Sequence, residues 1–233
     1  MKHFIIGKGK VGKTLLSSLK ACGEELGRDI HRSDVIWLTV PDSVIKKKVK
    51  EIESSLAEKH ILVHCSGFFP ASIMKNGKTN KLVSLHPAFS FSKPLDIFPE
   101  GIFWTFEGYG FVFGIFSDLI QKWKGKVKRI SEKQKELYHI ACVFASNFPI
   151  VSLLIAEKLF EKSGIEFEDI KKGLVHPVCE KVIGNSRLVD VLTGPAKRKD
   201  METILKEIEV LKEKDFEISE IYRLLSNFVL KNI

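Results

Sequence analysis

Three glycines between a short apolar run and an amphipathic pattern constrain this chain more than any other feature. Gly7, Gly9 and Gly12 form a G-x-G-x-x-G sequence directly after the apolar run 3–6. From Val11 onward, apolar residues recur at the spacing of a helix, so the glycines connect a buried strand to a helix. Backbone amides at the start of such a helix can hold a phosphate group. The sequence therefore predicts a phosphate-binding turn.

The same residues fit two classes of phosphate-binding protein. The glycines match the dinucleotide-binding turn, in which the second glycine lets the backbone approach a pyrophosphate. Extended to Lys13 and Thr14, they also match G-x-x-x-x-G-K-[ST], the P-loop of NTPases. A P-loop NTPase needs an Asp after a second strand for magnesium, and the available Asp42 directly follows Pro41. We prefer the dinucleotide interpretation, with a P-loop NTPase or a turn without ligand as alternatives.

The segment 23–33 lacks one part of the dinucleotide pattern. That pattern places an acidic residue at the end of a second strand, about 20 residues past the glycines, to bind the adenosine ribose. The segment has no apolar run able to form this strand, so we expect the second strand to be missing. Its acids fall on an expected loop: Glu24, Glu25 and Asp29. Its basic residues either face a 2′-phosphate, favouring NADP over NAD, or are solvated: Arg28, His31 and Arg32.

Short β-rich runs alternate with helical patterns over the first 130 residues. Strands are predicted at 3–6, 35–40, 60–64, 81–85, 102–106 and 127–130, with helices at 43–58 and 111–123. Such alternation is typical of a parallel sheet with right-handed crossovers. We therefore predict a shortened Rossmann domain, with a parallel sheet, over residues 1–130.

The character of the chain changes at Ser131, which starts a capping box completed by Gln134. A helical pattern runs from 132 to 163 with Pro149 inside it, where a kink or a break is expected. Further helices are predicted at 166–186 and 199–230. The fold class is therefore α/β plus all-α, with an all-helical domain over residues 131–233.

Charge and composition narrow the class of protein. The net charge is +8, but no basic stripe carries aromatic residues at stacking intervals, so we expect no nucleic-acid partner. The cysteines lie far apart without a Cys-x-x-Cys pair, which favours reduced thiols and argues against a structural metal site. The uninterrupted apolar stretches are too short for a membrane span, and the start of the chain does not resemble a signal peptide. We expect a cytoplasmic protein without a membrane partner.

Residues suited to ligand binding follow three predicted strands. The segments 40–42 and 65–67 end two of them, and His86 ends a third. In open α/β sheets, ligands bind at the carboxyl ends of the strands, so these residues are expected to form one site beside the glycine turn. Asp42 has an alternative role as the cap of the following helix.

Six motifs in this order resemble the Rossmann-like proteins with a DUF2520 domain, relatives of pyrroline-5-carboxylate reductase in the 6-phosphogluconate dehydrogenase-like superfamily. After the glycine turn they are VPDSVI (40–45), VHCSGF (63–68), SLHPAFSF (84–91), YHIACVFASNFP (138–149) and LTGPAKRKD (192–200). The resemblance covers nearly the whole chain. It implies an N-terminal NADP-binding domain, NAD being possible, and a helical domain that forms a homodimer.

The resemblance also implies roles for particular residues, with the 40–42 and 65–67 turns lining the nicotinamide and its ribose. The expected cofactor contacts are Gly7, Lys8, Gly9, Lys10, Val11, Gly12, Val40, Pro41, Asp42, Cys65, Ser66 and Gly67. The chain departs from the family pattern at its second strand, and at Lys199, where a glycine is usual and the turn is expected to change.

The strongest catalytic candidate is His86, because a histidine fixed at a strand end can donate a proton to a carbonyl or imine. Asn147 is expected to orient the substrate, and His139 lies on nearly the same helix face. Related β-hydroxyacid dehydrogenases carry a lysine four residues before such an Asn, but Val143 stands there. Arg198 is a candidate for a substrate carboxylate or phosphate, or is solvated.

The predicted function is NADP-dependent reduction of a small carbonyl or imine compound, with His86 as proton donor and Asn147 placing the substrate. Two alternatives remain at this point. One is a binding or regulatory protein that holds a dinucleotide without turnover, which the missing second strand favours. The other is a P-loop NTPase.

Overall fold

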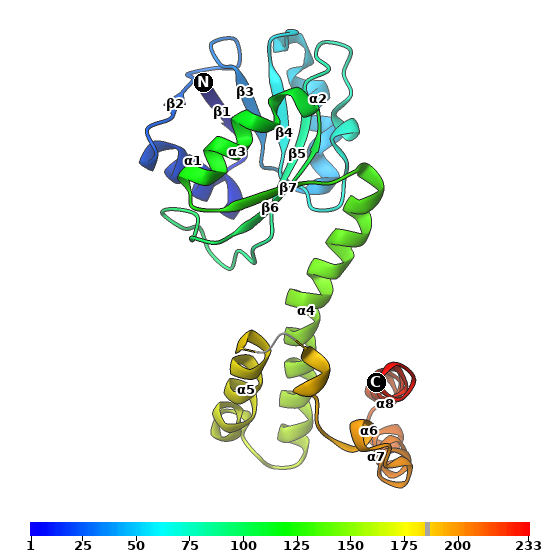
Figure 1. The fold of residues 1–233 in the computed structure, drawn as a ribbon. Coiled ribbons are helices and arrows are strands. Elements are labelled where there is room, and N and C mark those ends of the chain that lie inside the picture. Colours follow the sequence, from blue (N-terminus) through cyan, green and yellow to red (C-terminus); the bar gives the residue numbers. More distant parts are fainter. Residues whose placement is uncertain (185–186) are drawn as a thin grey trace. The chain divides into compact units, whose positions relative to one another are not determined.

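The computed structural model describes residues 1–184 and 187–233, and the chain divides into two units, Met1–Phe148 and Pro149–Ile233 (Figure 1). The division falls inside helix α4 (Glu132–Lys162), directly before its internal proline. The start of this helix is where the sequence pattern placed the domain boundary. The boundary at residue 130 stays a prediction.

The first unit is built on one sheet. Within the described residues the sheet has seven strands in the order β2-β1-β3-β4-β5-β6-β7. The strands are β1 (Lys2–Ile6), β2 (Glu25–Leu26), β3 (Val35–Leu38), β4 (Ile61–His64), β5 (Leu82–Pro87), β6 (Phe103–Gly108) and β7 (Lys126–Arg129). Strands β1 to β5 pair in parallel, so their carboxyl ends share one edge.

The predicted parallel sheet is confirmed for β1 to β5, whereas β6 pairs antiparallel with β5. β7 then pairs in parallel with β6, so both run opposite to the rest. The physical reason lies in the connection 88–102, which contains no helix in the described chain. A parallel pair requires a long crossover, but an antiparallel neighbour can be reached without one.

The shortened Rossmann domain is confirmed, but the second strand is reduced rather than missing. β2 consists of Glu25 and Leu26, paired in parallel with the start of β1. It forms because Leu26 packs against the core and Gly27 N donates to His3 O at 2.9 Å. The segment 27–34 that follows contains turns and bends, with no helix among these described residues.

Helices cover both faces of the sheet and bury two apolar clusters. On one face, α1 (Lys10–Ala21) and α3 (Phe113–Lys122) pack against the sheet around Trp37, Trp104 and Trp123. On the other face, α2 (Ile45–Ile52) and a short 3-10 helix, η3 (Ala71–Met74), pack against Ile36, Leu38 and Leu62. Figure 1 shows α1 and α3 on the same side of the strands.

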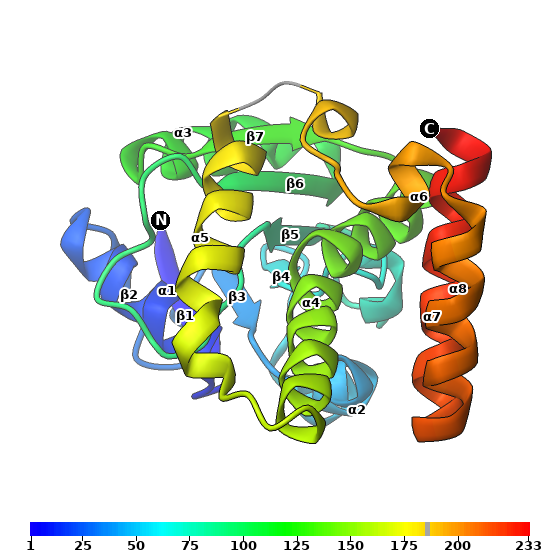
Figure 2. The same ribbon diagram turned by 90° about the horizontal axis from the view of Figure 1, so that it is seen from below.

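The second unit is helical, as predicted. Its helices are the rest of α4, then α5 (Phe167–Gly184), α6 (Pro195–Arg198), α7 (Met201–Lys214) and α8 (Phe216–Asn232). The predicted helix 166–186 corresponds to α5, and residues 185–186 lie outside the described residues. α7 and α8 lie side by side in Figure 2.

Two expectations for this unit need correction. The single helix predicted at 199–230 is divided at Asp215, whose carboxylate accepts from Ile218 N at 3.2 Å and caps α8. Lys199 does not disrupt its turn, because it adopts the left-handed conformation with φ 59° that a glycine would favour.

Helix α4 is long and apolar over much of its length. By length and composition alone it could cross a membrane, since its most apolar window has a mean hydropathy of 1.8 and is not buried. The expectation of no membrane span rested on uninterrupted apolar runs, which are shorter. The first turns of this helix are part of the α/β unit, where Lys135 is fully buried.

Candidate functional site

The carboxyl ends of β1, β3, β4 and β5 lie in a row, because these strands are adjacent and parallel. Gly7 follows β1, Thr39 follows β3, Cys65 follows β4, and His86 lies near the end of β5. The structure therefore brings the predicted ligand-binding segments of this unit to one edge of the sheet.

The glycine turn has the geometry that close approach of a ligand requires. Gly7 has φ +123°, and a Cβ there would lie 2.4 Å from Thr39 O. A Cβ at Gly12 would lie 2.4 Å from both Gly7 O and Thr39 Oγ1. By contrast, a Cβ at Gly9 would meet no described atom within 4 Å. Gly7 and Gly12 thus allow the turn to close, while Gly9 borders open space at the start of α1.

The start of α1 suits an anion. Gly9 is the N-cap and supplies no side-chain cap, and the first turn carries no acidic residue. The first amides of a helix have no partner within it, so they can donate to a phosphate. Lys8, Lys10 and Lys13 place positive charge around this turn. A pyrophosphate therefore fits the residues present.

A cavity of about 370 Å³ extends from this turn toward the end of β2. Its lining includes Gly7, Lys8 and Gly12 at one side and Leu26 and Gly27 at the other. The phosphate turn and the segment expected to meet an adenosine ribose therefore border a common space.

The three acids near β2 are already engaged. Glu24 accepts from Lys122 at 2.5 Å, and this bond holds the pKa of its carboxyl below the ordinary value. Asp29 Oδ1 accepts from Arg32 N at 2.9 Å, and Glu25 lies 3.7 Å from the ammonium of Lys2. Arg28 directly follows Gly27 and has no hydrogen bond or ion pair from its side chain within the described residues.

The turns after β3 and β4 are connected by Asp42 and Ser66. The Ser66 hydroxyl donates to Asp42 Oδ2 at 2.8 Å and accepts from Phe69 N at 3.0 Å. Asp42 provides no side-chain cap to the helix that follows, so its alternative role as a cap is wrong. Below the turn, His64 accepts from Ser66 N at 3.1 Å, and burial lowers its pKa to about 4.

A buried lysine, which the sequence did not indicate, lies beneath the same turn. The Nζ of Lys135 donates to Ser66 O at 2.8 Å, and its side chain is fully buried. The Ser84 hydroxyl donates to the same carbonyl at 3.3 Å. Burial lowers the pKa of Lys135 to about 8. Cys65 beside it is unsuited to act as a nucleophile, because burial raises its thiol pKa to about 12.

His86 is held by a second unpredicted residue. Its Nδ1 lies 2.9 Å from the hydroxyl of Tyr138, on the second turn of α4. Burial, and then the charge of Lys135, lower the pKa of His86 to about 3. The imidazole is therefore neutral at physiological pH, and any hydrogen bond or proton it donates comes from the neutral ring.

Gly67 is the point at which two imidazoles meet the turn. A Cβ on this residue would lie 2.3 Å from His139 Nδ1 and 2.9 Å from His86 Nε2. His139 Nδ1 is buried and has no hydrogen-bond partner in the part of the chain that the structure describes. Only a glycine leaves room for both rings here.

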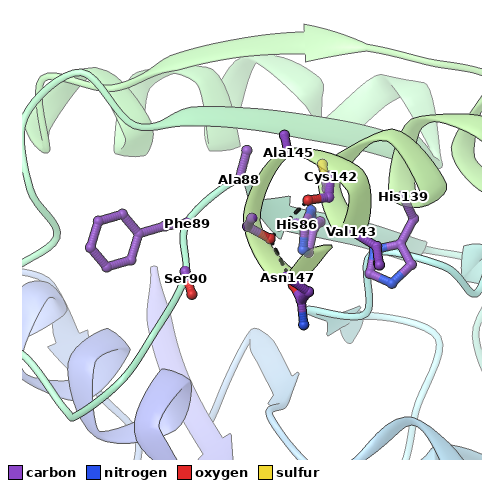
Figure 3. A pocket seen from close by; sticks show the side chains of 10 residues that line it. His86, Ala88, Phe89, Ser90, His139, Cys142, Val143, Ala145 and Asn147 are labelled. Carbon is purple, nitrogen blue, oxygen red and sulfur yellow. Dashed lines mark hydrogen bonds between the residues drawn. The ribbon is translucent and has the colours of Figure 1, made fainter. Parts of the chain in front are cut away.

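Beside these rings lies a pocket of about 280 Å³, shown in Figure 3. Its lining comes from β5, the loop after it and α4: His86, Ala88, Phe89, Ser90, His139, Cys142, Val143, Ala145, Ser146 and Asn147. The Ser146 hydroxyl lies 2.7 Å from Asn147 Oδ1 and fixes that side chain. No lysine, arginine or carboxylate is among these lining residues. Such a pocket is suited to a small neutral group held by hydrogen bonds.

The structure thus brings His86, His139 and Asn147 together, beside the turn that holds Ser66 and Gly67. Arg198 lies in α6 of the second unit, and its role toward a substrate stays a prediction. Sequence reasoning missed Lys135 and Tyr138. The capping box at Ser131 had placed both on the first turns of a helix, but gave no sign of which face is buried.

Comparison by sequence identifies a family. Residues 102–228 match the family described as "Domain of unknown function (DUF2520)", which confirms the resemblance seen in the motifs. No curated protein matches the chain.

Solved structures share the fold over almost the whole chain. A protein from Bacteroides fragilis, provisionally named an NADP oxidoreductase, is 20% identical with TM-score 0.80, over 99% of this chain and 98% of that one. A protein from Thermotoga maritima is 25% identical with TM-score 0.76, over 99% of this chain and 98% of that one. Pyrroline carboxylate reductase from Plasmodium falciparum, solved with NADP bound, is 14% identical with TM-score 0.52, over 98% of this chain and 97% of that one. The chain therefore shares its fold with these proteins.

Proposed function

Because this chain belongs to the DUF2520 family, with the fold of nicotinamide-dependent oxidoreductases, we propose that it reduces a small carbonyl or imine compound with NADPH. The observation that carries the proposal is the shared sheet edge. A phosphate turn open at Gly9 and a pocket containing His86 follow parallel strands of one sheet. Ligands of such sheets lie across this edge.

The cofactor contacts follow from the order of the strands. The amides that follow Gly9 hold the pyrophosphate, and the adenosine half extends over β2. Arg28 is available there, whereas Glu24 and Asp29 are engaged elsewhere. An arginine in this place favours a 2′-phosphate, so NADP is the preferred cofactor. The turns at 40–42 and 65–67 then line the nicotinamide half.

A bound nicotinamide would supply the hydride for the substrate carbon, and a proton from solvent would complete the reduction at oxygen or nitrogen. The chain's own residues provide the environment. With Nδ1 of His86 accepting from Tyr138, its Nε2–H donates a hydrogen bond to the atom that gains negative charge. Asn147 and His139 place the substrate in the pocket.

The NTPase alternative lacks the metal ligands it needs. Thr14 is fully buried, its hydroxyl donates to Lys10 O at 2.9 Å, and Leu95 N donates to it at 2.9 Å. Asp42 is bonded to Ser66. In a P-loop, the corresponding hydroxyl binds Mg²⁺. Here the Thr14 hydroxyl already donates one hydrogen bond and accepts another within the protein. These contacts favour the dinucleotide interpretation.

The second unit is suited to pair with a second copy of the chain. Its helices expose large apolar side chains, among them Leu174, Ile183, Leu205, Phe216, Leu224 and Phe228. On α7 and α8 these alternate with charged residues, as on amphipathic helices that pack against protein. The homodimer stays a proposal. Sedimentation in detergent-free buffer should give twice the chain mass, and a monomer would refute it.

Turnover tests the proposed function. Purified protein is mixed with NADPH and a panel of small aldehydes, ketones and cyclic imines, and the loss of NADPH absorbance is recorded. At least one compound should be reduced, and His86→Ala should lower kcat by about 10²–10³-fold, as loss of an oxyanion donor does. NADPH binding without turnover of any compound would instead support the non-catalytic alternative.

A further inference from the structure

The peptide between Ser66 and Gly67 is held in one orientation by the protein interior. Ser66 O accepts from Lys135 Nζ at 2.8 Å and from Ser84 Oγ at 3.3 Å. The chain has no cis peptide bond among its described residues, and in a trans peptide the C=O and N–H point in opposite directions. The Gly67 N–H therefore points away from Lys135. It donates to no acceptor in the part of the chain that the structure describes.

This amide lies where one half of a bound dinucleotide would pass. The chain order changes direction between β1 and β3, and a dinucleotide spans the sheet edge at that point. Its adenosine half lies over β2, so its other half lies over β3 and β4. Gly67 follows β4, with the imidazoles of His86 and His139 beside its Cα. The free N–H is thus available to the nicotinamide end.

The lysine that orients this peptide lacks the partner expected for a buried charge. Lys135 is fully buried, and no carboxylate of the described residues lies within 4 Å of its Nζ. The titratable groups around it come from several elements: Asp42, His64, Cys65, His86, Glu107 and Cys142. The Glu107 carboxylate accepts a hydrogen bond from Ala71 N at 2.6 Å. A buried ammonium without an ion pair is costly, and such groups cluster at functional sites.

We propose that Lys135 is a positioning residue, whose ammonium holds the Ser66 carbonyl so that the Gly67 N–H is presented as a hydrogen-bond donor to the nicotinamide end of the bound dinucleotide. This inference rests on the proposed function. It requires the charged form of Lys135, because a neutral amine is a weaker donor to the carbonyl.

Two probes separate this role from general damage to the site. NADPH reaches the nicotinamide end, whereas 2′-phospho-ADP-ribose carries the same adenosine and pyrophosphate without the nicotinamide. Lys135→Met should raise the Kd for NADPH about tenfold, the loss of one good hydrogen bond. It should leave the Kd for 2′-phospho-ADP-ribose within about twofold. Lys133→Met, on the exposed face of the same helix, is the matched control and should change neither Kd.

The dependence on pH provides a readout that a merely structural role would not move. In the wild type, the Kd for NADPH should rise above about pH 8, where Lys135 loses its proton, while that for 2′-phospho-ADP-ribose stays constant. Lys135→Arg keeps its charge in this range, so it should restore NADPH binding and abolish the rise. Each variant is checked for folding by circular dichroism.

The outcomes separate the two proposals. A wild type that binds neither probe overturns the proposed function and this inference with it. If the wild type binds both probes, and Lys135→Met weakens the binding of both equally or of neither, the role of Lys135 is overturned and the cofactor assignment stands. If Lys135→Arg does not fold, the Met variant and the wild-type pH series still decide the question.

Discussion

Replacing Lys135 by Met should make the protein more stable. The lysine is fully buried, and its Nζ makes one hydrogen bond, to Ser66 O, within the described residues. A methionine has nearly the same length and shape and carries no charge. Ser66 O keeps the longer bond from Ser84, at 3.3 Å, in the variant. This bond leaves the buried carbonyl with a donor, but holds the peptide less firmly than the ammonium at 2.8 Å does.

The size of the effect follows from the pKa of the lysine. Burial lowers it from 10.5 to about 8. Each pKa unit corresponds to 1.36 kcal/mol, so holding the ammonium in the folded protein near neutral pH costs about 3 kcal/mol. The lost hydrogen bond offsets about 1 kcal/mol of this. Lys135→Met should therefore raise the free energy of unfolding by about 2 kcal/mol, or the Tm by about 4–8 °C.

The sign of the pH dependence provides a second check. Between about pH 8 and 10.5, the unfolded chain holds the Lys135 proton and the folded chain has released it. The contribution of Lys135 to the stability of the wild type should therefore rise with pH across this window. This contribution is absent from Lys135→Met, so the gap between the two proteins should narrow as pH rises.

Urea unfolding at pH 7 and pH 10, followed by tryptophan fluorescence, measures both effects. Trp37, Trp104 and Trp123 are buried in the α/β unit and report its unfolding. Lys133→Met is the control and should leave stability unchanged. A Lys135→Met variant that is less stable than the wild type at pH 7 would refute the reasoning, because the ammonium would then be a net source of stability.

Three further predictions concern the sheet edge. Gly9→Val should abolish NADPH binding, measured by titration, with little change in Tm, because its side chain enters the open space at the start of α1. Gly12→Val should instead lower the Tm in a thermal melt, because its Cβ meets Gly7 O. Lys13→Ala should change the Kd for NADPH less than about threefold, a small electrostatic effect, and fluorescence titration would expose a larger one. The His86 ring should stay neutral from pH 8 down to about pH 5, and ¹⁵N NMR would contradict this by showing an imidazolium at pH 6.

The parts of the fold that the sequence predicts are those set by local pattern. The run before Gly7, the spacing after Val11 and the capping box at Ser131 each depend on neighbours within one or two turns. The structure places β1, α1 and α4 accordingly.

The errors arise where distant parts of the chain decide the outcome. β2 contains a single apolar residue, Leu26, and exists because its backbone pairs with β1. The direction of β6 is not encoded in its own alternation, which reads the same both ways. The absence of a helical pattern in 88–102 indicates the antiparallel direction of β6, because a parallel strand would need a crossover there.

The site shows the same division. Strand ends placed His86 beside the turn at Ser66, and the helix pattern placed Asn147 and His139 on one side of α4. Lys135, however, lies in the run EKQKE, which has the composition of a solvated surface. Its burial depends on how the first turns of α4 pack against the end of β4, and no local pattern contains that information.

Parallel titration of the purified protein with NADPH, NADH and Mg-ATP tests the central claim most directly. The open space at Gly9, the free side chain of Arg28 and the engaged hydroxyl of Thr14 predict saturable binding of NADPH, weaker binding of NADH and none of Mg-ATP. Saturable, magnesium-dependent binding of ATP, with no binding of either nicotinamide cofactor, would contradict the account.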